Sequence, residues 1–130
     1  MFTEEVEDAL EELESGSDDA LKKCNDLCAA RLEGLIRLVQ GDLSKGDRVK
    51  IITVITIDVH NRDVVSDLMS KRVESSSDFK WQSQMRHYWA PDDSNVNIRI
   101  CDFATAYSYE YTGNCSRLVI TPLTDRYYSY

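Results

Sequence analysis

The spacing of the apolar residues changes once along the chain, and this change restricts the fold more than any other feature. Before Pro91 apolar residues recur every three or four positions, as they do on one face of a helix. After Ser94 they alternate with polar residues, as in a strand: Val96, Ile98 and Ile100 are separated by Asn and Arg. The sequence therefore predicts an α+β protein with a helical first part and a strand-containing second part.

The clearest helix is predicted near residues 19–41. Asp18 or Asp19 is placed to cap its start, and Gly41 fits its end. One helical face of this range is apolar and consists of Leu21, Cys24, Cys28, Leu32, Leu35, Ile36 and Val39.

A second, shorter helix is predicted over about residues 77–89. Ser75 and Asp78 have the S-x-x-D spacing of a capping box, and Pro91 would end the segment. Its apolar face is aromatic and consists of Trp81, Met85, Tyr88 and Trp89.

Residues 49–59 are ambiguous. Their β-branched side chains favour a strand. The apolar run is nearly continuous, however, and it leads into residues 60–72, where the spacing is helical. Periodicity alone does not separate a buried strand from a buried helix here, so both alternatives stay open on the residues themselves.

The last part of the chain carries further strand signals. Tyr107, Tyr109 and Tyr111 alternate with other residues, and residues 112–114 (Thr-Gly-Asn) are typical of a turn. Leu-Val-Ile at 118–120 is typical of a short buried strand, which the following proline would end.

Acidity is concentrated at the beginning of the chain. Residues 1–20 hold nine acids and no base, so the remaining residues carry 23 − 9 = 14 acids against 15 bases. Such a block repels nucleic acid and anionic membrane surfaces, and we expect neither as a partner. Residues 1–18 are predicted to be a solvated, partly disordered leader. The alternative is an acidic docking helix, supported by the helical spacing of Val6, Leu10 and Leu13.

The four cysteines predict free thiols. The N-terminus is acidic and lacks the apolar region of an export signal, so we expect a reducing compartment. Cys24 and Cys28 are spaced to share a helical face, but a zinc site needs three or four ligands. Small buried thiols at a helix interface are the favoured interpretation, and we predict no metal site.

No catalytic residue is predicted either. The polar cluster His60–Asp63 is interpreted as a buried structural network in which Arg62 pairs with an acid. Neither the phosphate-loop pattern G-x-x-x-x-G-K-[ST] nor G-x-G-x-x-G occurs in the sequence. The chain by itself is therefore not expected to hold a phosphate group or Mg²⁺.

Five blocks together resemble axonemal dynein heavy chains, in the region just before the phosphate loop of the first AAA+ module. They occur in the family's order and at similar intervals, and the resemblance covers about residues 20–126. The blocks are LVQGDLSK (38–45), ITIDVHNRDVV (55–65), DFKWQSQMRHYW (78–89), YSYEYTGN (107–114) and LVITPLTDR (118–126).

The resemblance implies a domain organisation. Residues 19–92 would be a helical region from the C-terminal end of the linker, and residues 93–130 the start of a truncated AAA+ module. The resemblance does not cover the start of the chain, where residues 1–18 stay the acidic leader that their composition predicts. It also implies that residues 47–70 are helical, against their local strand propensity.

The resemblance further implies that residues 118–126 pass beside the adenine of ATP. Thr121 would offer a polar contact at the edge of the ring, and the apolar walls would come from Leu118, Val119, Pro122 and Leu123. ATP and Mg²⁺ are cofactors of the parent family. Because the chain lacks a phosphate loop, we expect no cofactor and no ATP hydrolysis from it alone.

The function implied by the resemblance is that of a dynein heavy-chain fragment. The parent would be an ATP-driven microtubule motor of cilia or flagella, and this piece would couple nucleotide state to linker movement. Its partners would be the remainder of the heavy chain, the subunits of the dynein complex and, through the parent, microtubules. The expected location is the cytoplasm, cytoskeleton and ciliary or flagellar axoneme. The alternatives are a small acidic, non-enzymatic interaction module and a non-functional truncated product.

Overall fold

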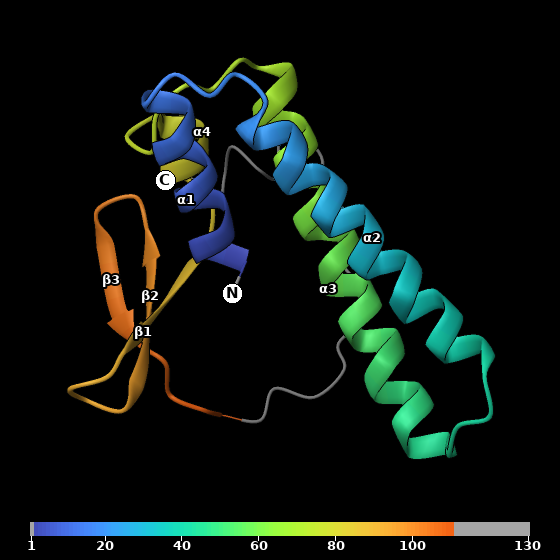
Figure 1. The fold of residues 1–130 in the computed structure, drawn as a ribbon. Helices are drawn as coiled ribbons and strands as arrows, with labels where there is room; N and C mark the ends of the chain where they lie inside the picture. The colour runs from blue at the N-terminus through green and yellow to red at the C-terminus, as the bar shows by residue number, and fades with distance from the viewer. Residues whose placement is uncertain (1, 111–130) are drawn as a thin grey trace, which may run out of the picture. The chain divides into compact units, whose positions relative to one another are not determined.

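A computed structural model describes residues 2–110 and is drawn in Figure 1. The chain forms two compact units, Met1–Gln82 and Ser83–Tyr130, which are described separately here. Among the described residues, the regular structure of the first unit is helical, and that of the second is an antiparallel sheet. The predicted α+β fold class is confirmed.

The first unit is built on a hairpin of two long helices. Helices α2 (Ala20–Gln40) and α3 (Lys45–Ser70) lie side by side along most of their length (Figure 1). The helices predicted at 19–41 and, from the resemblance, at 47–70 are thus confirmed. The strand that local propensity favoured for residues 49–59 does not form, because positions spaced three and four apart on α3 pack against α2.

The turn between the two helices is closed by polar contacts. The Ser44 hydroxyl accepts a hydrogen bond from the Asp47 amide at 3.1 Å, which caps the start of α3. Arg48 donates to the backbone carbonyls of Val39 and Gly41 at the end of α2. Gly41 is the residue at which α2 ends, as predicted. Capping at Ser44 was not among the sequence predictions.

The acidic leader contains a helix, α1 (Phe2–Glu14). Val6 and Leu10 on this helix are fully buried, so the expectation of a partly disordered leader is wrong for residues 2–14. The helical spacing of Val6, Leu10 and Leu13, which supported the alternative of an acidic docking helix, correctly indicated the face of α1 that packs on the core. The amides of Gly16 and Ser17 donate to the carbonyls of Leu13 and Glu12, with Gly16 at φ +100°, and this motif ends the helix.

The helix predicted over residues 77–89 is wrong beyond its first turn. Helix α4 spans only Phe79–Gln82, and strand β1 (Arg86–Ala90) follows it. The cap also differs, because the Asp78 carboxylate accepts from the Lys80 amide at 2.7 Å, whereas Ser75 accepts from Ser77. Aromatic residues favour strands, and pairing with a neighbouring strand satisfies the backbone of β1.

The second unit contains a three-stranded sheet in the order β1-β2-β3. Strand β2 (Asn95–Ile100) pairs antiparallel with β1 and with β3 (Phe103–Ala106). The strand predicted around residues 96–100 is confirmed. Tyr107 and Tyr109 follow β3 without regular structure and contact each other edge to face. Tyr111, the turn at 112–114 and the strand at 118–120 lie outside the described residues.

The core of the first unit joins α1 to the hairpin and to α4. Trp81 is fully buried and contacts Phe2 edge to face, with ring centroids 6.3 Å apart. The largest fully buried side chains are Trp81, Leu10, Leu68, Val6, Val65 and Cys28.

Within residues 2–110, no helix combines the length and the apolarity that crossing a membrane demands.

Candidate functional site

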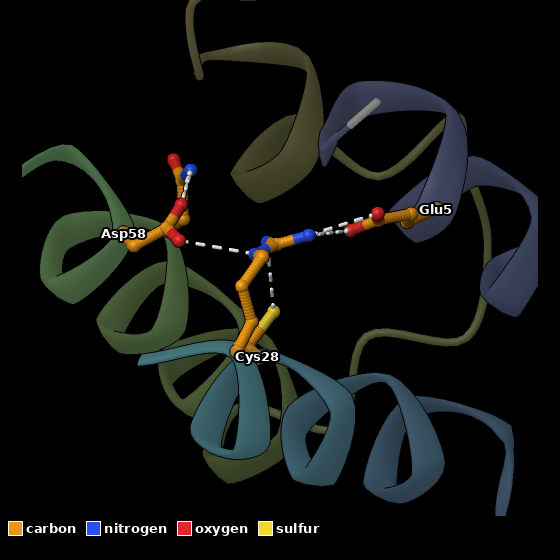
Figure 2. A network of polar contacts seen from close by, with 5 residues as sticks. Glu5, Cys28 and Asp58 are labelled. Carbon is orange, nitrogen blue, oxygen red and sulfur yellow. Dashed lines mark hydrogen bonds and ion pairs between the residues drawn. The ribbon is translucent and has the colours of Figure 1, made fainter. Parts of the chain in front are cut away.

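A polar network centred on Arg31 joins the three long elements of the first unit (Figure 2). Arg31 lies on α2, and its Nη1 donates to both carboxylate oxygens of Glu5 on α1, at 2.9 and 3.1 Å. Its Nε donates to Oδ2 of Asp58 on α3 at 3.0 Å. A guanidinium group presents donors on several edges of one plane, so a single side chain fixes two helices against a third.

Asp58 is the acidic residue that makes this network necessary. It is 8% exposed and lies on a helix whose neighbouring side chains are mostly apolar. A buried carboxylate without partners is strongly destabilising. Arg31 supplies the opposite charge, and the Asn61 amide donates to the other Asp58 oxygen at 3.4 Å.

The charges of the network are partly screened by solvent. The side chains of Arg31 and Glu5 are 36% and 37% exposed, whereas that of Asp58 is 11% exposed. Burial acts to lower the pKa of Arg31, but the hydrogen bond and charge of Glu5, together with Asp58, outweigh it and raise that pKa. Because of the screening, we expect the Arg31 contacts to contribute about 1–2 kcal/mol to stability, less than a fully buried pair.

Two buried thiols lie beside the network. Arg31 Nη2 is 3.8 Å from Cys28 Sγ, and Cys24 lies one turn earlier on the same face of α2. Burial raises the pKa of Cys24 to about 12 and also raises that of Cys28. Both are free cysteines packed in the core, as the favoured interpretation expected. Among residues 2–110, no three His, Cys, Asp or Glu side chains gather where they could bind a metal ion.

Helix α1 also makes polar contacts with the chain around α4. The Trp81 indole Nε1 donates to Glu7 Oε1 at 3.3 Å. The Ser76 backbone amide donates to Glu14 Oε1 at 3.2 Å. Together with the Glu5–Arg31 pair, three acids of α1 accept hydrogen bonds from three separate parts of the first unit. The acidity of α1 therefore serves in docking.

The predicted site residues have different outcomes. The adenine-contacting residues predicted at 118–123 lie outside the described part of the chain, so their role stays a prediction. Arg62 does pair with an acid, at 2.7 Å from Asp63, but the two side chains are 39% and 61% exposed. The predicted pairing is confirmed, whereas the predicted burial of that network is wrong.

The sequence analysis did not predict the Arg31 network, in which Asp58 is the buried acid. The signal for it was Asp58, an acid that interrupts the apolar run of residues 49–59 at a position facing α2. Chemically, all members of the network are held by complementary partners, which suits positioning of helices rather than proton transfer or nucleophilic attack.

Comparison with known proteins gives a consistent result. No family model matches the chain. The chain is 50% identical over 127 residues to the ciliary dynein beta chain of Heliocidaris crassispina. It is 49% identical over 127 residues to human dynein axonemal heavy chain 17, and 46% identical over 125 residues to the flagellar outer arm dynein beta chain of Chlamydomonas reinhardtii.

The matches cover nearly all of this chain but only a small part of each relative. The match to the Heliocidaris crassispina and human chains includes 98% of this chain but only 3% of the length of those relatives. It leaves 130 − 127 = 3 residues uncovered, so it also includes most of the acidic residues at the start, which the resemblance seen in the sequence did not reach. The chain belongs to the axonemal dynein heavy chain family of the ciliary and flagellar axoneme, and it corresponds to a segment of about 3% of the length of those proteins.

Proposed function

We propose that this chain is a mechanical segment of an axonemal dynein motor, which couples the nucleotide state of the first AAA+ module to movement of the linker. The observation that carries the proposal is the half-identical match, over nearly the whole chain, to one segment of ciliary and flagellar dynein heavy chains. The order of the five sequence blocks, which end at LVITPLTDR (118–126), supports placing that segment at the junction between linker and module.

The described geometry suits a part that transmits force. Two long antiparallel helices resist bending better than single helices, and the Arg31 network fixes α1 against both of them. Apolar side chains on α3 are also left half-exposed, among them Val49, Ile52 and Ile57 at 50%, 50% and 56%. Exposed apolar side chains of this kind suit packing against other parts of a larger assembly.

The nucleotide contact in this proposal belongs to residues 118–123. Leu118, Val119, Pro122 and Leu123 would form the apolar wall for adenine, with Thr121 at its edge. ATP and Mg²⁺ would be bound by the complete motor, and microtubules would be its track. The phosphate grip would come from segments of the parent, because the printed sequence has no phosphate loop.

Coupling is tested in a complete heavy-chain motor that carries this segment, by measuring ATP turnover and microtubule gliding velocity on the same preparation. Arg31→Gln removes the charge that holds α1 and Asp58. We expect turnover to be retained and gliding velocity to fall about twofold or more, since coupling variants act at this scale. Arg37→Gln is the matched control, because Arg37 pairs with Glu33 on the same exposed face of α2, at 2.6 Å.

Two results would count against the proposal. If turnover and velocity fell in proportion, the segment would support catalysis or folding rather than coupling. If neither changed in Arg31→Gln, the hairpin would have no mechanical role, and an interaction module would be the better description.

Nucleotide binding is tested separately on the 130-residue chain by titration calorimetry with Mg-ATP. An adenine wall without a phosphate cradle lacks the charge-assisted contacts that dominate nucleotide affinity, so we expect no heat of binding at micromolar concentrations. A micromolar dissociation constant would contradict the assignment of the phosphate grip to other segments.

A further inference from the structure

Helix α1 has a charge pattern that does not support an isolated helix. Its seven acids are spaced so that several lie three or four positions apart, where like charges repel. Its last turn has no basic residue, although a helix C-terminus favours positive charge. With 13 residues it is also near the lower limit of length for a helix that is stable alone in water.

When α1 is docked, both its apolar and its acidic side chains have partners in the first unit. Val6 and Leu10 are fully buried in the common core. Glu5, Glu7 and Glu14 accept hydrogen bonds from Arg31, Trp81 and the Ser76 amide. Contacts with the rest of the first unit therefore stabilise the docked α1.

The hairpin depends less on α1 than α1 depends on the hairpin. Helices α2 and α3 pack against each other along their length, and the polar turn at residues 41–48 closes their far end without any contribution from α1. The connection from α1 to α2 is short and turns at Gly16, whose φ of +100° suits glycine. Local opening of α1 can thus leave the hairpin intact.

We propose that α1 is a strap that is helical only while docked, and that Arg31 is the positioning residue that holds it. Release of the strap converts residues 2–14 into the solvated acidic segment that their composition favours, and it uncovers Trp81, Cys24 and Cys28. The first unit then has two states, one with the strap closed and one with the hairpin alone.

Hydrogen exchange of the whole 130-residue chain, followed by mass spectrometry, tests this proposal. We expect residues 2–14 to exchange much faster than the buried turns of α3 around Val65 and Leu68. In Arg31→Gln, exchange of residues 2–14 should rise roughly tenfold, and exchange of α3 should rise as well, because buried Asp58 loses its opposite charge. Arg37→Gln, which removes an exposed pair within α2, should change neither.

A second variant and a second measurement guard against a simple failure to fold. Glu5→Gln weakens the same pair from the α1 side and leaves Arg31 with Asp58, so exchange of residues 2–14 should rise while that of α3 changes less than about twofold. In a Cys101→Ser, Cys115→Ser background, labelling of Cys24 and Cys28 by N-ethylmaleimide should accelerate in step with the exchange of residues 2–14.

The proposal is overturned if residues 2–14 exchange as slowly as the buried turns of α3, or if Glu5→Gln accelerates both segments equally. Helix α1 would then be a fixed part of the core. This result leaves the dynein assignment untouched, because the test involves neither nucleotide nor microtubules.

Discussion

The contrast between Leu68 and Ile52 gives the sharpest test of the hairpin. Both lie on α3, but Leu68 is 1% exposed and Ile52 is 50% exposed. Replacement by alanine removes three carbon atoms from either residue, worth about 2.4 kcal/mol if fully buried at roughly 0.8 kcal/mol per carbon. At Leu68 a cavity adds to this loss, for a total of about 3–5 kcal/mol. Ile52 is half-exposed, so only about half of this burial free energy can be lost, and no cavity forms. We therefore expect Ile52→Ala to lower the free energy of unfolding by about 1 kcal/mol.

These free energies correspond to clearly different melting temperatures. For a unit of this size, each kcal/mol lowers Tm by roughly 4–8 °C. Thermal unfolding of the 130-residue chain, followed by circular dichroism, should show a fall of more than about 10 °C for Leu68→Ala and a few degrees for Ile52→Ala. Equal shifts in the two variants would refute the packing face that the structure gives to α3.

Three further predictions concern single groups. Gly16→Ala should destabilise the first unit by about 1 kcal/mol, because its φ of +100° strains any residue with a Cβ, and the loss would appear as faster exchange of α1. Ser44→Ala removes the cap of α3 and should cost about 1 kcal/mol in denaturant unfolding. Burial raises the pKa of Cys24 from 9.0 to about 12, so the folded chain keeps a proton that the unfolded chain loses. The stability that the protonated Cys24 thiol gives to the folded chain is present below pH 9 and is lost as the pH rises towards 12. Tm should therefore fall more steeply over that range in the unmodified chain than in Cys24→Ala. Parallel curves of Tm against pH in the two proteins would contradict this prediction.

The helices at 20–40 and 45–70 could be predicted from the sequence by two different routes. For α2 the apolar face from Leu21 to Val39 was sufficient, because its spacing is helical throughout. For α3 the residues at 49–59 favoured a strand, and only the family resemblance indicated a helix. The missing physical information was the partner, since packing against α2 offsets a weak local preference.

The errors at the two ends of the first unit have related causes. Acidic composition indicated a disordered leader, because composition contains no information on the donors that the acids of α1 find at Arg31, Trp81 and Ser76. The aromatic spacing over 77–89 matched a helix, but Tyr88 and Trp89 pair with strand β2, a contact that no local pattern reveals. The Arg31 network was missed for the same reason, since Glu5, Arg31 and Asp58 are far apart in the sequence.

Coupling to nucleotide is the central claim, and hydrogen exchange in a complete axonemal heavy-chain motor tests it most directly. Exchange of the segment that corresponds to residues 2–70 would be compared with and without a non-hydrolysable ATP analogue. The account predicts that protection of this segment changes when the analogue binds. If exchange of this segment were identical in both states although the analogue is bound to the motor, that result would contradict coupling.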